Sequence, residues 1–192
     1  MTTSPPTSRI HRYVLGLAGP PTSRDMADPQ GPDVILLHRS ARSMLRAQLQ
    51  APGIVRGGPL FGFFREGALH VRYAAPQGYR WWDLASPLAL DPRYALGWAD
   101  ALAAASAHPL DWVGSWVMYA DSEVGPVEQD LRWLGAGRAA GILDDRAVLV
   151  SVGWQDGRLT SAGYRLLGQE VETLPVEAFN ERETESGSAE GP

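Results

Sequence analysis

The sequence predicts an α/β protein in which helices flank a central sheet. Apolar segments of strand length alternate along the chain with segments whose apolar residues recur at helical spacing. The dipeptides Glu66-Gly67 and Asp156-Gly157 each separate two strand-like runs, so part of the sheet should be antiparallel. The 192 residues, 44% of them apolar, suffice for one domain with a hydrophobic core.

The first expected elements are a strand over residues 33–38 and a helix over residues 39–50. The helix carries on one face Ala41, Met44, Leu45 and Leu49. A second face carries arginines at 39, 42 and 46, which we interpret as solvated surface. Pro52-Gly53 should end this helix.

A hairpin should follow, with strands over residues 58–65 and 68–76. Asp91-Pro92 then provides an N-cap and a proline at the first helical position, so a helix is expected over residues 92–107. His108-Pro109 should stop it.

The last third of the chain predicts a strand over residues 111–120 and a helix from Pro126 to residue 141. Spacing i, i+4, i+7 places on the inward face of this helix Val127, Leu131 and Leu134. Two strands joined at Asp156-Gly157 complete the order β-α-β-β-α-β-α-β-β.

Composition divides the chain into three parts. Residues 1–32 are rich in Pro, Ser, Thr and Gly and are expected to be a mobile arm, whereas residues 33–172 should form the domain. Residues 173–192 are expected to be an acidic disordered tail. Residues 169–192 contain seven Glu and one Arg, a local charge of −6; since the whole chain carries −5, the remainder is near +1.

Composition also excludes several classes of function. The chain has no Cys, which excludes disulfides, thiolate metal sites and Cys nucleophiles. All 17 basic residues are Arg, which excludes Schiff-base chemistry and a P-loop lysine. The near-neutral domain predicts no nucleic-acid partner, and the absence of a long apolar run predicts no membrane span. Because residues 13–19 are too short and glycine-rich for a signal sequence, we expect a cytoplasmic protein.

One set of residues resembles a known family. A Gly-Gly-x-Leu-x-Gly pattern spans residues 57–62, and Gly114-Ser115-Trp116 precedes Asp130 at the head of a helix. With the order of elements, these residues resemble the JAB/MPN (JAMM) domain of prokaryotic type over about residues 33–165. The resemblance implies a JAB/MPN-like (cytidine-deaminase-like) mixed sheet flanked by helices. It also implies a zinc site, which active members build from two His and one Asp, with a Glu as general base and a Ser near the oxyanion.

Most of that chemistry is missing from this chain. The two His positions fall on Val117 and Tyr119, the following Pro on Ala120, and the Ser on Val127. The Glu position falls on Val55, or on Ile54 if the register shifts by one. Only Asp130 is retained, and one carboxylate does not hold zinc against solvent.

The remaining polar residues do not rebuild a metal site in the sequence. Val117 and Tyr119 share a strand face and should fill the former metal pocket with apolar and aromatic groups. We interpret Asp130 as a first-turn acid that favours the helix dipole, and we expect a solvated acidic turn from Asp121, Glu123 and Glu128. The four His, none of which has ligand spacing, are each expected at the surface or at a helix end: His11, His38, His70 and His108.

These observations predict a catalytically inactive JAMM-like domain, without a cofactor, that binds proteins or acts as a scaffold. The expected partner is a ubiquitin-like tail, added as a strand to a sheet edge, or an active JAMM relative. Trp is enriched at binding hot spots, and the candidates for this surface are Trp81, Trp82, Trp112, Trp116 and Trp133. Trp112 and Trp116 should face the same side of their strand.

Two alternatives stay open. The first is a zinc isopeptidase or metallopeptidase, acting on ubiquitin-like modifiers, whose ligands lie elsewhere in the chain. The second is an unrelated α/β binding domain.

Overall fold

The computed structural model describes residues 8–16, 31–51, 55–78, 86–106, 110–123, 127–144 and 146–179. The helices are α1 (Arg9–Val14), α2 (Arg39–Gln48), α3 (Pro92–Ala105) and α4 (Val127–Ala139). The strands are β1 (Val34–Leu37), β2 (Val55–Arg65), β3 (Ala68–Ala74), β4 (Asp111–Glu123), β5 (Val148–Gln155), β6 (Arg158–Leu167), β7 (Glu170–Leu174) and β8 (Val176–Ala178). The predicted order therefore holds from β1 to β6, with α1 added before it and two strands after it.

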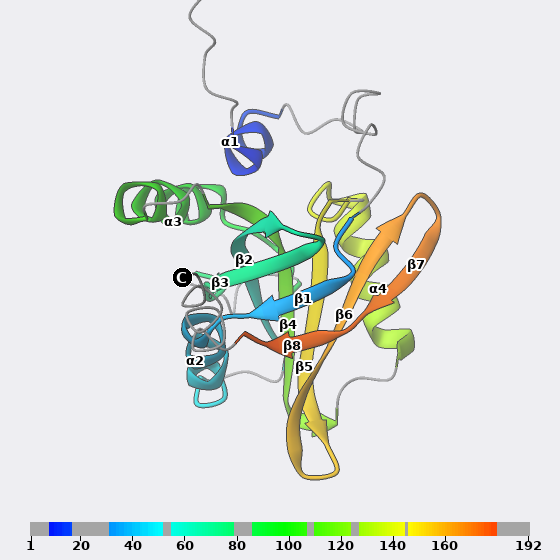
Figure 1. Cartoon of the computed structure of the whole chain (residues 1–192). Coiled ribbons are helices and arrows are strands. Elements are labelled where there is room, and N and C mark those ends of the chain that lie inside the picture. The colour runs from blue at the N-terminus through cyan, green and yellow to red at the C-terminus, as the bar shows by residue number, and fades with distance from the viewer. Residues whose placement is uncertain are drawn as a thin grey trace, which may run out of the picture.

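All eight strands belong to one mixed sheet of order β7-β6-β5-β4-β2-β3-β1-β8 (Figure 1). β1 is parallel to β3 and β8, and β4 is parallel to β5, while the remaining pairs are antiparallel. The two edge strands, β7 and β8, are separated in the chain by Pro175 alone. The sheet therefore has to curl until its two edges meet, and the carbonyl of Pro175 accepts a hydrogen bond from the Ile35 N–H.

The sheet separates two buried clusters of side chains. The α2 core, which lies on the side of α2, includes Leu45, Leu60, Trp116, Val150 and Leu174. The α3/α4 core, on the other side, includes Leu102 of α3, Leu134 of α4, Phe61, Trp112 and Tyr119. Because strands alternate their side chains between faces, β2, β4 and β5 supply both cores.

Local sequence signals explain most element boundaries. The Asp91 carboxylate accepts hydrogen bonds from the N–H groups of Arg93 and Tyr94, which confirms it as the N-cap of α3. Both predicted hairpin turns are confirmed. Glu66-Gly67 and Asp156-Gly157 have positive φ at both positions, as a two-residue type I′ turn requires. The stops expected at Pro52-Gly53 and His108-Pro109 lie outside the described residues.

The alternation along β4 contains one irregularity that the sequence did not predict. Leu60 pairs with Gly114 and the next residue, Phe61, pairs with Trp112, so one residue of β4 has no partner on β2. This bulge moves Trp112 into the α3/α4 core, whereas Trp116 lies in the α2 core. The expectation that both Trp share a face is therefore wrong.

The inward face of α4 is also shifted from the predicted one. Leu134 is buried as expected, but the Leu131 side chain is 39% exposed. Asp130 is fully buried in its place, since its carboxylate is hydrogen-bonded inside the fold. The face of α4 that points into the core therefore contains Asp130, whereas apolar spacing predicted Leu131 there. The side chain of Val127 lies outside the described part of the chain.

Ordered structure extends beyond residues 33–172 at both ends. α1 lies within the first 32 residues and buries Ile10 completely. β7 continues past residue 172, and β8 pairs with β1 in a segment that composition assigned to the acidic tail. Short elements that dock through one or two apolar residues leave little compositional signal. Within the described residues, no helix is long and apolar enough to cross a membrane.

Candidate functional site

Three of the positions matched to the zinc motif lie on one side of the sheet, in or against the α3/α4 core: Val55, Val117 and Tyr119. Val55 of β2 lies directly opposite Tyr119 of β4 in the antiparallel pair. Val117 precedes Tyr119 by two residues and faces the same core, as predicted. Both β4 side chains are buried, with 0% and 3% of their surface exposed, so apolar and aromatic groups fill this position.

Asp130 joins the same group from α4. Its Oδ1 accepts a hydrogen bond of 2.8 Å from the Tyr119 hydroxyl, and its Oδ2 accepts one of 3.0 Å from the Tyr164 hydroxyl of β6. The carboxylate is 0% exposed. Its role therefore goes beyond the first-turn interaction with the helix dipole, because it links α4 to β4 and β6 through two buried hydrogen bonds.

Both hydroxyls are held in the protonated, donating form. Burial raises the pKa of Tyr119 far above its ordinary value, and the hydrogen bond to Asp130 and the charge of Asp130 raise it further. Burial and then the Asp130 charge raise the pKa of Tyr164 to about 12.

Sequence reasoning missed Tyr164 as a member of this site. It lies on a strand 34 residues after Asp130 and belongs to no local motif. Ser151 was also missed: it lies opposite Val117 in the β4–β5 pair and is fully buried. The Ser151 Oγ and the Trp133 Nε1 have no hydrogen-bond partner among the described residues.

The residues present do not fit a zinc ion of the JAMM type. Val117 offers no lone pair, and the neutral Tyr119 hydroxyl is a weak ligand. Each oxygen of Asp130 already accepts a hydrogen bond from a tyrosine. Among the described residues, no group of three or more His, Asp or Glu is placed to hold a metal ion. The side chains of Asp121, Glu123 and Glu128 lie outside that part.

The tryptophans proposed for a binding surface have different environments. Trp116 and Trp112 are 0% and 1% exposed and donate their indole N–H groups to the carbonyls of Ala75 and Gly114, so neither presents a surface. This corrects the expectation for both. Trp133 is half-buried against the α3/α4 core. Trp81 and Trp82 lie outside the described residues.

Two histidines expected to be separate form a pair. His38 Nε2 lies 3.1 Å from His70 Nδ1, and His38, the N-cap residue of α2, is 2% exposed. His38 stacks on Phe179 at 4.2 Å, and His70 stacks on Phe63 at 4.8 Å. Burial, followed by the charge of Arg65, lowers the pKa of His70. The parallel pairing of β1 with β3 causes this contact, which no sequence spacing indicates.

A small cavity of about 60 Å³ lies beside the double glycine of the JAMM-like pattern. It is lined by Gln48, Ala51, Arg56, Gly57, Pro76, Gln77 and Gly78. Its size suits a few water molecules rather than a peptide side chain. Gly57 is required there for close packing, because a Cβ atom would lie 2.1 Å from the Pro87 carbonyl oxygen.

Fold and site together define a mixed α/β protein with a filled, hydrogen-bonded pocket beneath α4. No family model matches the sequence. No curated protein matches it either. The fold is similar to that of protein DSY2949 from Desulfitobacterium hafniense, with a TM-score of 0.54 at 15% identity over 77% of this chain and 94% of that chain. A protein from Salinibacter ruber matches with a TM-score of 0.44 at 19% identity, over 73% of this chain and 88% of that chain. The first likeness concerns the fold alone.

Proposed function

We propose that this chain has a JAB/MPN-like fold whose zinc chemistry has been lost and that it acts by binding another protein. One observation carries the proposal: Tyr119 and Tyr164 donate to both oxygens of the buried Asp130, where the motif would hold zinc. The pairing of Val55 with Tyr119 supports the mapping, because the family's general base and second His need to be neighbours.

Zinc binding tests this proposal directly. We expect the purified chain to contain no stoichiometric zinc and to bind none in calorimetry. A variant with Val55→Glu, Val117→His and Tyr119→His, plus Tyr164→Phe to release one Asp130 oxygen, should gain zinc binding. Adding Asp130→Asn to that variant is the matched control and should remove it, because the third ligand is then neutral.

Other results favour the alternatives. Stoichiometric zinc in the unmodified chain, lost in Asp130→Ala, would replace this proposal with the zinc isopeptidase or metallopeptidase. A four-site variant that folds but binds no zinc would count against the mapping and favour an unrelated α/β binding domain.

For the partner, we propose a ubiquitin-like tail or an active JAMM relative encountered in the cytoplasm. The two edge strands have five and three residues, so strand addition is limited to a short extended segment. Titrating the labelled chain with a ubiquitin-like protein, intact or lacking its tail, tests the first partner, because recognition of the tail is lost on truncation. Binding to a purified active JAMM relative, and to neither form of the ubiquitin-like protein, would identify the second.

A further inference from the structure

Helix α1 is held in the way that a bound peptide is held. It has only six residues, too few for a stable helix in water, so contacts with the rest of the fold must maintain it. It packs against α3 and the start of β4, and the chain next enters the sheet at Val34 (Figure 1). Its neighbours in space are thus far from it in sequence.

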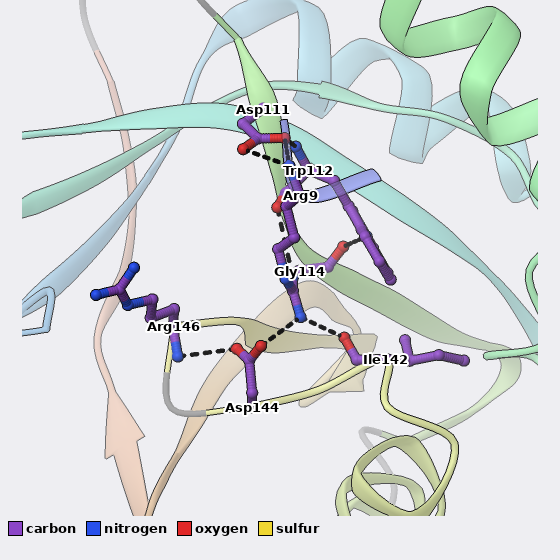
Figure 2. A network of polar contacts seen from close by, with 7 residues as sticks. All are labelled: Arg9, Asp111, Trp112, Gly114, Ile142, Asp144 and Arg146. Carbon is purple, nitrogen blue, oxygen red and sulfur yellow. Dashed lines mark hydrogen bonds and ion pairs between the residues drawn. The ribbon is translucent and has the colours of Figure 1, made fainter. Parts of the chain in front are cut away.

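Arg9 makes most of the polar contacts between α1 and the rest of the fold (Figure 2). Its backbone N–H lies 3.0 Å from both carboxylate oxygens of Asp111. Its guanidinium donates to the carbonyl of Ile142 at 2.8 Å and to the carboxylate of Asp144 at 3.1 Å, and it lies over the Trp112 ring at 4.3 Å. One arginine thereby satisfies groups from two segments about thirty residues apart.

Apolar contacts complete the attachment. Ile10 is 0% exposed and belongs to the same buried cluster as Leu102 and Trp112. The ring of Tyr13 meets Trp112 edge-on at 5.3 Å between centroids. The recognised pattern is therefore an arginine, an apolar residue directly after it, and an aromatic residue three positions further on.

Charge on the two surfaces is complementary. α1 carries Arg9, His11 and Arg12 and no acidic residue. The surface beneath it contributes Asp111 and Asp144 to the Arg9 contacts, and Asp100 of α3 lies 3.5 Å from His11. Such complementarity selects a basic segment and disfavours an acidic one.

We propose that Asp111, Trp112, Ile142 and Asp144, together with the adjoining face of α3, form a peptide-binding groove, the α1 groove. In cis α1 occupies it; in trans it takes a helical segment of a partner protein with the arginine–apolar–x–x–aromatic pattern of α1. A tethered segment competes only through its effective concentration, so a free segment of equal chemistry displaces it at sufficient concentration. This inference goes beyond the proposed function and does not depend on the JAMM resemblance.

The test uses the full chain and a fluorescent peptide with the sequence of residues 8–16. Arg9→Ala and, separately, Ile10→Asp weaken α1 in cis, so each variant should bind the peptide at least tenfold more tightly than the unmodified chain. Arg12→Ala is the matched control, because it removes one positive charge from the same helix and leaves Arg9 and Ile10 in place, and it should bind like the unmodified chain. A peptide lacking the arginine should bind at least tenfold more weakly.

Hydrogen exchange of the α1 amides decides the remaining outcomes. The proposal is supported if the amides lose protection in the variants while circular dichroism stays native and the peptide binds. It is overturned if α1 is released without peptide binding, if α1 stays protected, or if both variants unfold, since α1 is then an integral part of the core. It is also overturned if Asp111→Asn with Asp144→Asn, added to the Arg9→Ala variant in which α1 is already weakened, leaves peptide affinity unchanged.

Discussion

Asp130 shows how one residue can change the packing of an element without changing its secondary structure. Helix periodicity favoured Leu131 as a core residue, yet Leu131 is partly exposed and Asp130 is fully buried. Burying a carboxylate without partners would be costly, but two tyrosine hydroxyls supply hydrogen bonds to it. The carboxylate is an acceptor shared between two strands, and each of its oxygens uses one lone pair for a tyrosine hydroxyl.

The tyrosines of this site predict a loss of stability in alkali. The pKa of Tyr164 is about 12 in the fold against 10 when unfolded, so above pH 10 the folded state binds more protons than the unfolded state. The contribution of Tyr164 to the free energy of unfolding is fully present below pH 10 and is lost as the pH rises toward 12. We expect Tyr164 to contribute about 2 kcal/mol to the fall in the free energy of unfolding over that range, a contribution that Tyr164→Phe should lack.

The absence of Lys makes this measurement specific, since among side chains only the six Tyr titrate between pH 10 and 12. Asp130→Asn removes the charge that raises both pKa values, so phenolate absorbance should appear at lower pH than in the unmodified chain. Identical titration curves for the two proteins would contradict the role assigned to Asp130.

At the scale of elements, β4 depends on close backbone contact at its bulge. A Cβ atom on Gly114 would lie 2.1 Å from the Val148 carbonyl oxygen of β5. We expect Gly114→Ala to lower the free energy of unfolding by about 1–3 kcal/mol, because the strands have to separate locally. Chemical denaturation measures the difference.

Gly135 of α4 is the matched control, since nothing lies within 4 Å of a Cβ atom there. Gly135→Ala should stabilise the chain by about 0.5–1 kcal/mol through higher helix propensity. If Gly114→Ala and Gly135→Ala both raised the free energy of unfolding, the β4–β5 contact would not be what requires glycine at position 114.

At the scale of the whole molecule, the meeting of β7 and β8 at Pro175 makes the sheet one continuous support for both cores. Leu174, at this junction, is 3% exposed and belongs to the α2 core. We expect Leu174→Ala to lower the free energy of unfolding by about 2–4 kcal/mol. The unfolding transition should stay single, because neither core forms without the sheet.

Val171, three residues earlier on the same strand, is 40% exposed and provides the control. Val171→Ala should change the free energy of unfolding by about 0.5 kcal/mol or less. Two separate thermal transitions in Leu174→Ala, seen by calorimetry, would mean that the cores fold independently.

The sequence by itself determined the elements whose signals are local. Apolar periodicity and turn dipeptides placed β1 to β6 and α2 to α4, because hairpin turns and the Asp91 cap depend on residues near one another in the chain. The shared face of Val117 and Tyr119 followed from strand geometry alone.

Only the tertiary structure decided the rest. The hydrogen bond from Tyr164 to Asp130, the His38–His70 pair and the docking of α1 join residues 34, 32 and about 100 positions apart. The opposite faces of Trp112 and Trp116 result from a bulge set by pairing with β2. Such contacts depend on which strands become neighbours and on how the sheet curls, and neither is encoded in a local stretch of sequence.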